Sequence, residues 1–583
     1  METTNLSKIR RNKMLNTINE IKKNITDEET LTNLSMIENE LTKKKYGLIW
    51  EEHEERVDKE LETKIPTFEE VKDKEIVSNP KDKFNFLLEG DNLHSLYLLE
   101  KTHKGLIDVI YIDPPYNTGN KDFAYNDQFI DNLDGYKHSK WLSFMEKRLR
   151  IAKNLLSKSG IILVSIDENE EAQLKLLCDE IFDESNRLST HHIKVRYDNK
   201  SLNEDNDWQP VMEYVYIYAK DKSNFYANKP SEEYDLSKFQ YKITELENGE
   251  KIKIGNKDVT IFKDGQWKIE KLPGRIGLLK ETWASGSIVR QSGTAAEFLA
   301  KYLIQRKEID GLNCLYKIDN MGEDGLGYRY VSGPKKADAI RGKFYSGVPL
   351  ERLNDINNNG SSKKTRPITN YYDFSGDFGN IRNEGGIPFN SGKKPVKMLK
   401  ELINYHTKKD ATILDFFAGS GSTAQAVLEL NSDDNGQRHF ILCTNNENQI
   451  CENITYKRIK NVIEGYGKYN PLEANLKYYK CTYIPRINTE DENLHNNLLI
   501  NIKNLIQLEN GIEIDDNKIR VYLDEDELDK FSKNQSKLDV CEKVYISSDI
   551  LLTSMQESIF KNNNIEVYII PEYYFEDEIM EVM

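Results

Sequence analysis

Apolar residues recur along this chain with two different spacings, and each spacing predicts a different kind of element. Over residues 1–60 they come at helical spacing, as at Leu6 and Ile9, and no proline interrupts them, which predicts a helical N-terminal region. Further along, short apolar runs that suit buried strands alternate with amphipathic stretches. One such stretch, 138–157, predicts a helix with Trp141 on its apolar face as a core residue. The alternation predicts an α/β fold around a buried sheet.

The most informative strand runs from Ile107 to Ile112 and stops at Asp113-Pro114-Pro115-Tyr116. A buried strand that ends so abruptly is expected at the carboxyl edge of an open α/β sheet, where ligands bind. Because the prolines fix the backbone, the Asp113 carboxylate and a rigid carbonyl form a pair of acceptors that suits an exocyclic amino group. Tyr116 offers a flat face to a base. An ordinary Pro-Pro turn beside a core tyrosine would have the same sequence, so the motif needs a partner elsewhere in the chain.

A strand followed by a glycine turn, about 300 residues later, provides that partner. Residues 411–417 fit a strand, Gly419 and Gly421 a tight turn, and 424–430 a helix. Glycines let a ligand approach the backbone closely, and the helix N-terminus adds positive potential. Taken alone, this turn also fits a dinucleotide-binding fold.

Together the two motifs resemble those of DNA amino-methyltransferases, in which D-P-P-Y holds the target amine and D-x-F-x-G-x-G binds S-adenosylmethionine. The circularly permuted order, with D-P-P-Y first, is similar to the β class. That class includes Mod subunits of type III restriction–modification systems and solitary adenine methyltransferases, among them a clostridial one. The resemblance implies a Rossmann-like, S-adenosylmethionine-dependent methyltransferase sheet. It also implies methyl transfer to adenine N6, since the final tyrosine of the motif goes with adenine more often than with cytosine N4.

The resemblance also assigns roles to individual residues. The catalytic residues it implies are Asp113, Pro114, Pro115 and Tyr116. It places the cofactor against Asp91, Asn92, Phe389, Asp415, Phe417, Gly419, Gly421 and Glu447. Phe389 lies in a segment similar to F-x-x-x-K-P that has one residue more than usual, and Glu447, 26 positions after Gly421, is the acidic residue suited to ribose hydroxyls. No metal is expected.

A long insertion without βαβ rhythm separates the motifs, and part of it is basic. Residues 251–400 hold 27 Lys and Arg against 16 Asp and Glu, although the whole chain has a net charge of −16. Positive charge gathered in one segment of an acidic chain marks where a phosphate backbone would bind. We therefore expect an inserted target-recognition domain for duplex DNA, a solvated lysine-rich surface being the alternative. The expected contacts are Lys335, Lys336, Arg341, Lys343, Tyr345, Lys363 and Lys364.

Composition sets the remaining limits. Hydrophobic residues at 38% and charged residues at 31% describe a soluble protein, no apolar run reaches membrane-spanning length, and the N-terminus lacks the apolar core of a signal peptide. The six cysteines form no C-x-x-C pair, which favours reduced residues over disulfides or a zinc site. These features predict a cytoplasmic protein without a membrane partner, and the resemblance implies a bacterial one.

At 583 residues the chain is too long for one core, and we expect five regions. They are an N-terminal helical region (1–60), a first methyltransferase part (61–220), a target-recognition domain (221–385), a second methyltransferase part (386–470) and a C-terminal α/β domain (471–583). The expected function is site-specific methylation of adenine in duplex DNA by base flipping. The alternatives are an RNA methyltransferase, a cytosine N4 enzyme, a Mod subunit that works with a restriction subunit, and a non-catalytic DNA-recognition subunit. Either a monomer or a homodimer is compatible with the sequence.

Overall fold

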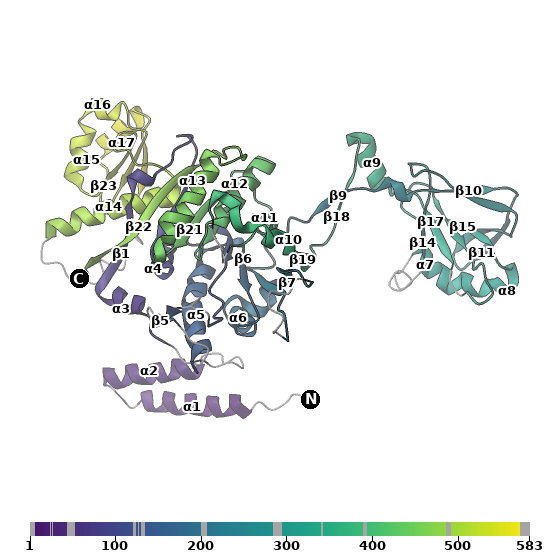
Figure 1. Ribbon diagram of the computed structural model, residues 1–583, viewed down its shortest axis with the longest axis horizontal. Coiled ribbons are helices and arrows are strands. Elements are labelled where there is room, and N and C mark those ends of the chain that lie inside the picture. Colours follow the sequence, from purple (N-terminus) through teal and green to yellow (C-terminus); the bar gives the residue numbers. More distant parts are fainter. Residues whose placement is uncertain are drawn as a thin grey trace. The chain divides into compact units, whose positions relative to one another are not determined.

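The structure is a computed structural model that divides into two compact units, Met1–Asn228 with Thr369–Met583, and Lys229–Ile368 (Figure 1). The second unit therefore interrupts the first in sequence. The described residues are 6–23, 25, 27–42, 50, 53–119, 124–125, 128–129, 134–199, 207–283, 294–339, 342–388, 393–485 and 491–571.

A ten-stranded sheet organises the first unit. Its strands follow the order β1 (Lys64–Glu70), β22 (Asn475–Pro485), β2 (Phe84–Glu89), β21 (His439–Thr444), β20 (Thr412–Asp415), β3 (Ile107–Ile112), β6 (Leu156–Ile166), β8 (Met212–Ala219), β7 (Arg187–Lys194) and β19 (Tyr371–Asp373). From β22 to β6 every neighbouring pair is parallel, whereas β1 and β8 pair antiparallel with the strands beside them. The predicted α/β class with a Rossmann-like sheet is confirmed.

The strands β3 and β20 are direct neighbours in this sheet, although they lie far apart in the sequence. Ile413 pairs with Val109 and Leu414 with Ile110, in parallel register. All six residues of β3 are buried, as expected for a strand covered on both faces. Because parallel strands end at the same edge, the two predicted motifs come together there.

Two groups of helices pack beside the sheet. The first comprises α4 (Asn92–His103), α5 (Lys137–Leu155), α6 (Glu171–Cys178) and α14 (Asp491–Asn510), and the second α11 (Val396–Ile403), α12 (Ser422–Asp434) and α13 (Tyr456–Glu464). Helix α5 buries Trp141 and Leu149 in one core with Ile110 of β3, and full burial of such a side chain stabilises by about 1.5–3 kcal/mol. The predicted helix 138–157 ends at Leu155, because β6 begins at Leu156 with no loop between them.

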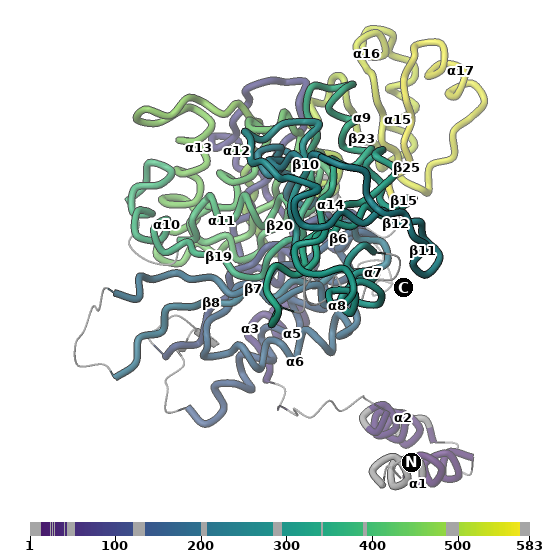
Figure 2. Tube along the Cα trace, turned by 90° about the vertical axis from the view of Figure 1, so that its right-hand side faces the viewer, coloured from purple at the N-terminus to yellow at the C-terminus, as the bar shows by residue number. Residues whose placement is uncertain are grey.

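The described N-terminal residues form the helices α1 (Leu6–Lys22), α2 (Glu28–Thr42) and α3 (Arg56–Thr63). Helices α1 and α2 lie side by side in Figure 1 and Figure 2. The Lys22 ammonium joins them by donating to Ser35 (2.9 Å) and Glu38 (2.6 Å). Helix α3 leads directly into β1, so this part of the N-terminal region is continuous with the sheet.

The second unit is built on an antiparallel sheet, which explains why its sequence shows no βαβ rhythm. Its strand order is β11 (Glu250–Ile254), β12 (Lys257–Phe262), β15 (Leu315–Asp319), β16 (Tyr328–Ser332), β17 (Lys343–Ser346) and β14 (Lys280–Trp283). Two further pairs are β10 (Tyr241–Glu245) with β13 (Trp267–Lys271), and β9 (Ser231–Glu233) with β18 (Lys363–Thr365). The helices α7 (Ala295–Phe298), α8 (Lys307–Asp310) and α9 (Leu350–Asn359) complete it. Val259, Tyr316 and Val331 belong to a hydrophobic core of its own.

The C-terminal part has a small parallel sheet of β23 (Ile519–Tyr522), β24 (Lys543–Ile546) and β25 (Glu566–Ile569), with helices α15 (Glu525–Ser532), α16 (Gln535–Leu538) and α17 (Ser554–Asn562). Phe531, Val544 and Phe560 share a separate core. Among the helices of the described residues, none is long and apolar enough to cross a bilayer.

Candidate active site

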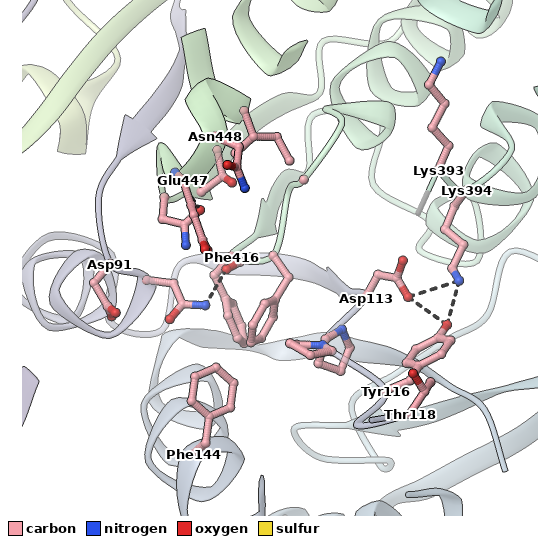
Figure 3. A pocket seen from close by; sticks show the side chains of 18 of the residues that line it. Asp91, Asp113, Tyr116, Thr118, Phe144, Lys393, Lys394, Phe416, Glu447 and Asn448 are labelled. Atoms are coloured by element: carbon pink, nitrogen blue, oxygen red, sulfur yellow. Dashed lines mark hydrogen bonds and ion pairs between the residues drawn. The ribbon is translucent and has the colours of Figure 1, made fainter. Parts of the chain in front are cut away.

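A cavity of about 920 Å³ opens where β3 and β20 end, and both motifs line it (Figure 3). Cavities of roughly 300–1,000 Å³ hold small ligands and cofactors in proteins. The first motif contributes Asp113, Pro114, Pro115 and Tyr116, and the second contributes Phe417 and Gly419. The sequence-predicted catalytic residues are therefore in one cavity with part of the glycine turn.

Within the first motif, Tyr116 turns its hydroxyl back towards the acid that begins the motif. The hydroxyl oxygen lies 2.8 Å from Asp113 Oδ1 and 3.0 Å from Glu213 Oε2, so its single proton bonds one carboxylate at a time. The indole N–H of Trp141 donates to the Pro115 carbonyl at 2.7 Å. Trp141 is thus the core residue that the sequence predicts, and it also fixes the backbone of the motif.

A lysine completes this arrangement. Lys394 Nζ donates to the Tyr116 hydroxyl oxygen (2.6 Å) and to Glu213 Oε2 (2.8 Å), and it lies 3.1 Å from Asp113 Oδ1. Figure 3 shows the ammonium, the tyrosine hydroxyl and the Asp113 carboxylate facing one another. Burial raises the pKa of Asp113, and the Lys394 ammonium offsets part of that rise. The four groups form one charge network at the Asp113 end of the cavity.

The residue that follows the motif is held by a second buried acid. Asn117 has a left-handed φ of 59°, and its Nδ2 donates to Glu170 Oε1 at 2.5 Å. The same oxygen lies 2.7 Å from His138 Nδ1. Burial raises the pKa of Glu170. These contacts anchor the chain where it leaves Tyr116.

At the other end of the cavity, Asp415 supports the glycine turn from below and does not line the cavity. Its Oδ1 accepts the Phe417 N–H (3.0 Å) and its Oδ2 accepts the Thr423 hydroxyl (2.6 Å). Gly419 and Gly421 have left-handed φ angles of 46° and 74°, which residues with a side chain rarely adopt. Gly419 therefore leaves the backbone open to a ligand, while Gly421 is the N-cap residue that precedes α12.

Two aromatic rings and two acids form the walls near this turn. The rings of Phe144 and Phe417 lie 5.9 Å apart between centroids, tilted by 50°. Asn92 Nδ2 donates to the Phe416 carbonyl (2.9 Å), and Asp91 caps α4 by accepting the Leu93 N–H (2.8 Å). Asp91 thus combines a capping role with a place on the cavity wall, and Glu447 lines the same cavity.

A buried arginine ties these walls to the N-terminal region. Arg148, 1% exposed, bonds both carboxylate oxygens of Glu55 (3.0 and 3.1 Å) and Asn92 Oδ1 (2.6 Å). Its guanidinium lies 3.6 Å from the ring centroid of Phe144. Glu55 precedes α3, and both Glu55 and Glu60 line the cavity. The segment before the sheet is therefore part of the pocket.

Comparison with known proteins agrees with this geometry. Residues 107–457, which contain both motifs and the inserted unit, match the family described as DNA methylase. The chain belongs to the DNA methylase family.

Among similar DNA methylases, the Mod subunit of the type III restriction–modification enzyme StyLTI from Salmonella typhimurium is 32% identical over 62% of this chain and 53% of its own length. The EcoPI Mod subunit of Escherichia phage P1 is 31% identical over 63% of this chain and 58% of its own. The type II methyltransferase M.KpnI of Klebsiella pneumoniae is 30% identical over 63% and 82%. The chain spans about half the length of the Mod subunits that it matches.

Some of the residues that line the cavity of this DNA methylase could be predicted from the sequence, and others could not. Asp91, Asn92, Phe417, Gly419 and Glu447 line the cavity, whereas Asp415 and Gly421 shape the turn behind it. Phe389 lies outside the described residues. The residues that could not be predicted are Glu55, Phe144, Arg148, Glu213 and Lys394. Glu213 and Lys394 lie far apart in the sequence, and no spacing rule indicates that their side chains meet.

The predicted DNA contacts have different environments within the second unit, which carries 25 Lys and Arg against 19 Asp and Glu. Lys335 and Lys336 are exposed. Lys363 and Lys364 are exposed on β18, but each is paired in register with a glutamate of β9, Glu233 and Glu232 respectively.

The other three predicted contacts are a paired lysine, a buried tyrosine and an arginine outside the described residues. Lys343 is paired with Glu281 (2.5 Å). Tyr345 requires correction, because it is 3% exposed and its hydroxyl donates to Glu281, so its ring is not available to stack on a base. Arg341 lies outside the described residues.

One acidic cluster outside the cavity has the geometry of a metal site. The carboxylates of Glu70, Glu75 and Glu513 converge within 4.8 Å. The buried Lys477 ammonium bonds all three, at 2.5 Å from Glu70 and 2.8 Å from Glu75. Since a cation of the protein already lies among these acids, the cluster is an ion-pair network.

Proposed function

We propose that this protein is a site-specific DNA methyltransferase that transfers a methyl group from S-adenosylmethionine to adenine N6 in duplex DNA. The observation that carries the proposal is the meeting of Asp113-Pro114-Pro115-Tyr116 and the glycine turn in one cavity, on adjacent parallel strands. This arrangement sets the Asp113 carboxylate beside the glycine turn, which supports methyl transfer between two bound molecules.

The residues of the cavity suit S-adenosylmethionine. Glu447 and Asp91 offer carboxylates to ribose hydroxyls, Phe144 and Phe417 offer aromatic faces to an adenine ring, and Gly419 leaves the backbone accessible. When bound, the cofactor supplies a methyl group on an electrophilic sulfonium.

The chain's own residues orient the target. Asp113 accepts hydrogen bonds from the exocyclic amine, which turns the nitrogen lone pair towards the methyl group. Tyr116 stacks on the flipped base and offsets part of the few kcal/mol that unstacking costs. Alignment of the amine by fixed groups, more than removal of a proton before attack, supplies the acceleration.

The choice of adenine and the identity of partners are also proposals. The tyrosine at the end of the first motif favours adenine N6 over cytosine N4. A second candidate function, modification subunit of a type III restriction complex, is favoured by the similarity to two Mod subunits. A solitary enzyme, as in clostridial adenine methyltransferases, and a homodimer are the alternatives, and co-purification with or without a restriction subunit separates them. We place its action in the bacterial cytoplasm, at the nucleoid.

The test is methyl transfer by the purified chain from labelled S-adenosylmethionine to duplex DNA, with the product identified by nucleoside mass spectrometry. We expect N6-methyladenine from the wild type. Asp113→Ala should lower the rate by about 10²-fold or more, because the amine loses its acceptor, while cofactor affinity changes little. Asp433→Ala, which removes an exposed carboxylate paired with Lys400, serves as the control. Near-normal methylation by Asp113→Ala would refute the assignment.

A further inference from the structure

Two residues outside the recognised motif hold its acid and its tyrosine together. Glu213 comes from β8, and Lys394 comes just before α11, so they lie on either side of the second unit in the sequence. Lys394 is 8% exposed on its side chain, and its ammonium contacts Asp113, Tyr116 and Glu213 within 3.1 Å. It also lies 4.8 Å from the ring centroid of Tyr116.

The charges of this network matter because the site is buried. A carboxyl group accepts hydrogen bonds from an amine most strongly when it is ionised, and burial disfavours its charged form. A cation within hydrogen-bonding distance favours the charged form, whereas a second carboxylate disfavours it. In this network the cation is Lys394 and the second carboxylate is Glu213. Both contact the Tyr116 hydroxyl, as Asp113 also does.

We propose that Lys394 and Glu213 are opposed positioning residues for methyl transfer: Lys394 keeps Asp113 ionised and Tyr116 in place, and Glu213 holds Lys394 while weakening its effect on Asp113. This inference rests on the proposed function and deepens it. The two residues act through Asp113 and Tyr116.

The other groups that act on Asp113 are few. Tyr116 lies on the same motif, and its hydroxyl donates to Asp113. Tyr111 of β3 and Asp415 of β20 interact electrostatically with Asp113 from the neighbouring strands. Asp415 is held by its own hydrogen bonds, and Tyr111 donates to or accepts from Ser165 at 2.8 Å. Among the described residues that contact Asp113 directly, Lys394 is therefore the cation.

The experiment measures single-turnover methyl transfer to DNA between pH 5 and 9 for the wild type, Lys394→Met, Lys394→Arg and Glu213→Gln. For Lys394→Met we expect a slower rate at low pH, with the midpoint of the acid limb moved up by about 1–3 pH units and recovery at high pH. Lys394→Arg keeps the charge and should keep the midpoint near that of the wild type. Glu213→Gln removes the opposing charge and should move the midpoint down.

The control is Lys397→Met. Lys397 lies in the first turn of α11, is exposed and is paired with Asp377. This variant should leave the midpoint unchanged. Cofactor affinity and thermal unfolding of each variant show whether the fold is intact.

The opposite signs expected for Lys394→Met and Glu213→Gln are the decisive readout, because a purely structural defect lowers the rate at every pH alike. Equal midpoints in wild type, Lys394→Met and Glu213→Gln would overturn the inference, and so would shifts of the same sign. If Lys394→Met fails to fold, the pair Lys394→Arg and Glu213→Gln still decides. Absence of methyl transfer by the wild type at every pH would instead refute the proposed function.

Discussion

At the scale of single residues, Asp415 shows how a motif acid serves the site without touching the cavity. Both of its oxygens accept hydrogen bonds, one from the Phe417 N–H and one from Thr423. Burial nevertheless raises its pKa to about 7, because these bonds offset only part of the cost of desolvation. The carboxyl group that holds the glycine turn should therefore titrate near neutral pH.

This predicts a pH-dependent stability that Asp415→Asn removes. The unfolded chain ionises this residue near pH 3.9, whereas the folded chain keeps its proton up to a pH of about 7. The folded state thus binds more protons between these values, and stability falls as pH rises, by at most about 1.4 kcal/mol per pH unit. Urea unfolding from pH 5.5 to 8.5 should show the wild type losing stability relative to Asp415→Asn up to about pH 7 and staying level above it. Parallel curves throughout would contradict the prediction.

Site residues could be predicted from the sequence where they follow one another along the chain. Asp113 to Tyr116 could be recognised because one strand end carries the whole motif. Lys394 and Glu213 could not, since their meeting depends on the sheet order and on where the chain returns after the inserted unit. Tyr345 was misjudged because a tyrosine among basic residues suits base stacking and a sheet core equally well, and only the fold decides between them.

At the scale of elements, α3 and the residue before it form part of the cavity wall through the pair of Glu55 and Arg148. Glu55 also forms a capping box with Asp58 at the start of α3. A buried arginine that loses its carboxylate is left with an uncompensated charge. The N-terminal region therefore supports the end of the pocket that Asn92 and Phe144 line.

We expect Glu55→Ala to lower the free energy of unfolding by at most about 3–5 kcal/mol, the usual loss when one partner of a buried ion pair is removed, because the Asp91 carboxylate stays 3.5 Å from the Arg148 guanidinium. Cofactor affinity should fall as well, because Arg148 also holds Asn92 and packs on Phe144. Denaturant unfolding and titration calorimetry measure the two effects. The matched control is Glu54→Ala, whose exposed pair with Lys59 should contribute less than about 1 kcal/mol. Equal effects of the two variants would exclude the role given to Glu55.

Elements were predicted well where burial determines the pattern. The strand β3 is a buried apolar run that ends at a turn, and such a run has few alternatives. The junction of α5 and β6 was missed because Leu155 and Leu156 are both apolar, and no glycine or proline separates them. The antiparallel sheet of the second unit left only short runs of mixed polarity, too short to order from the sequence.

At the scale of the whole molecule, charge is divided unevenly between the two units. Residues 229–368 have a surplus of six positive charges in a chain of net charge −16. A phosphate backbone is attracted to residues 229–368 and repelled by the rest of the chain, which is acidic. We propose that the second unit supplies the phosphate contacts of the DNA complex.

Its lysines should not contribute equally. Replacing Lys335 and Lys336 by alanine should reduce the salt dependence of DNA binding by about 0.9 per lost contact in the log–log slope. Replacing Lys363 and Lys364 should reduce it less, since Glu233 and Glu232 lie opposite them in the strand register and repel a phosphate there. Fluorescence anisotropy with duplex DNA at several salt concentrations compares the two double variants. An unchanged slope in both would place the DNA on another surface.

The order β2-β21-β20-β3 has a consequence for synthesis on the ribosome. The strands β2 and β3 are made early, but in the finished sheet two strands from beyond residue 411 lie between them. Until those strands emerge, β2 and β3 have unpaired apolar edges of the kind that promotes aggregation. The inserted unit, with its own hydrophobic core, is able to fold during this interval and to shorten the effective loop between the two halves. We expect nascent chains that end between residues 370 and 410 to need chaperone protection, and release from chaperones to follow the appearance of β21.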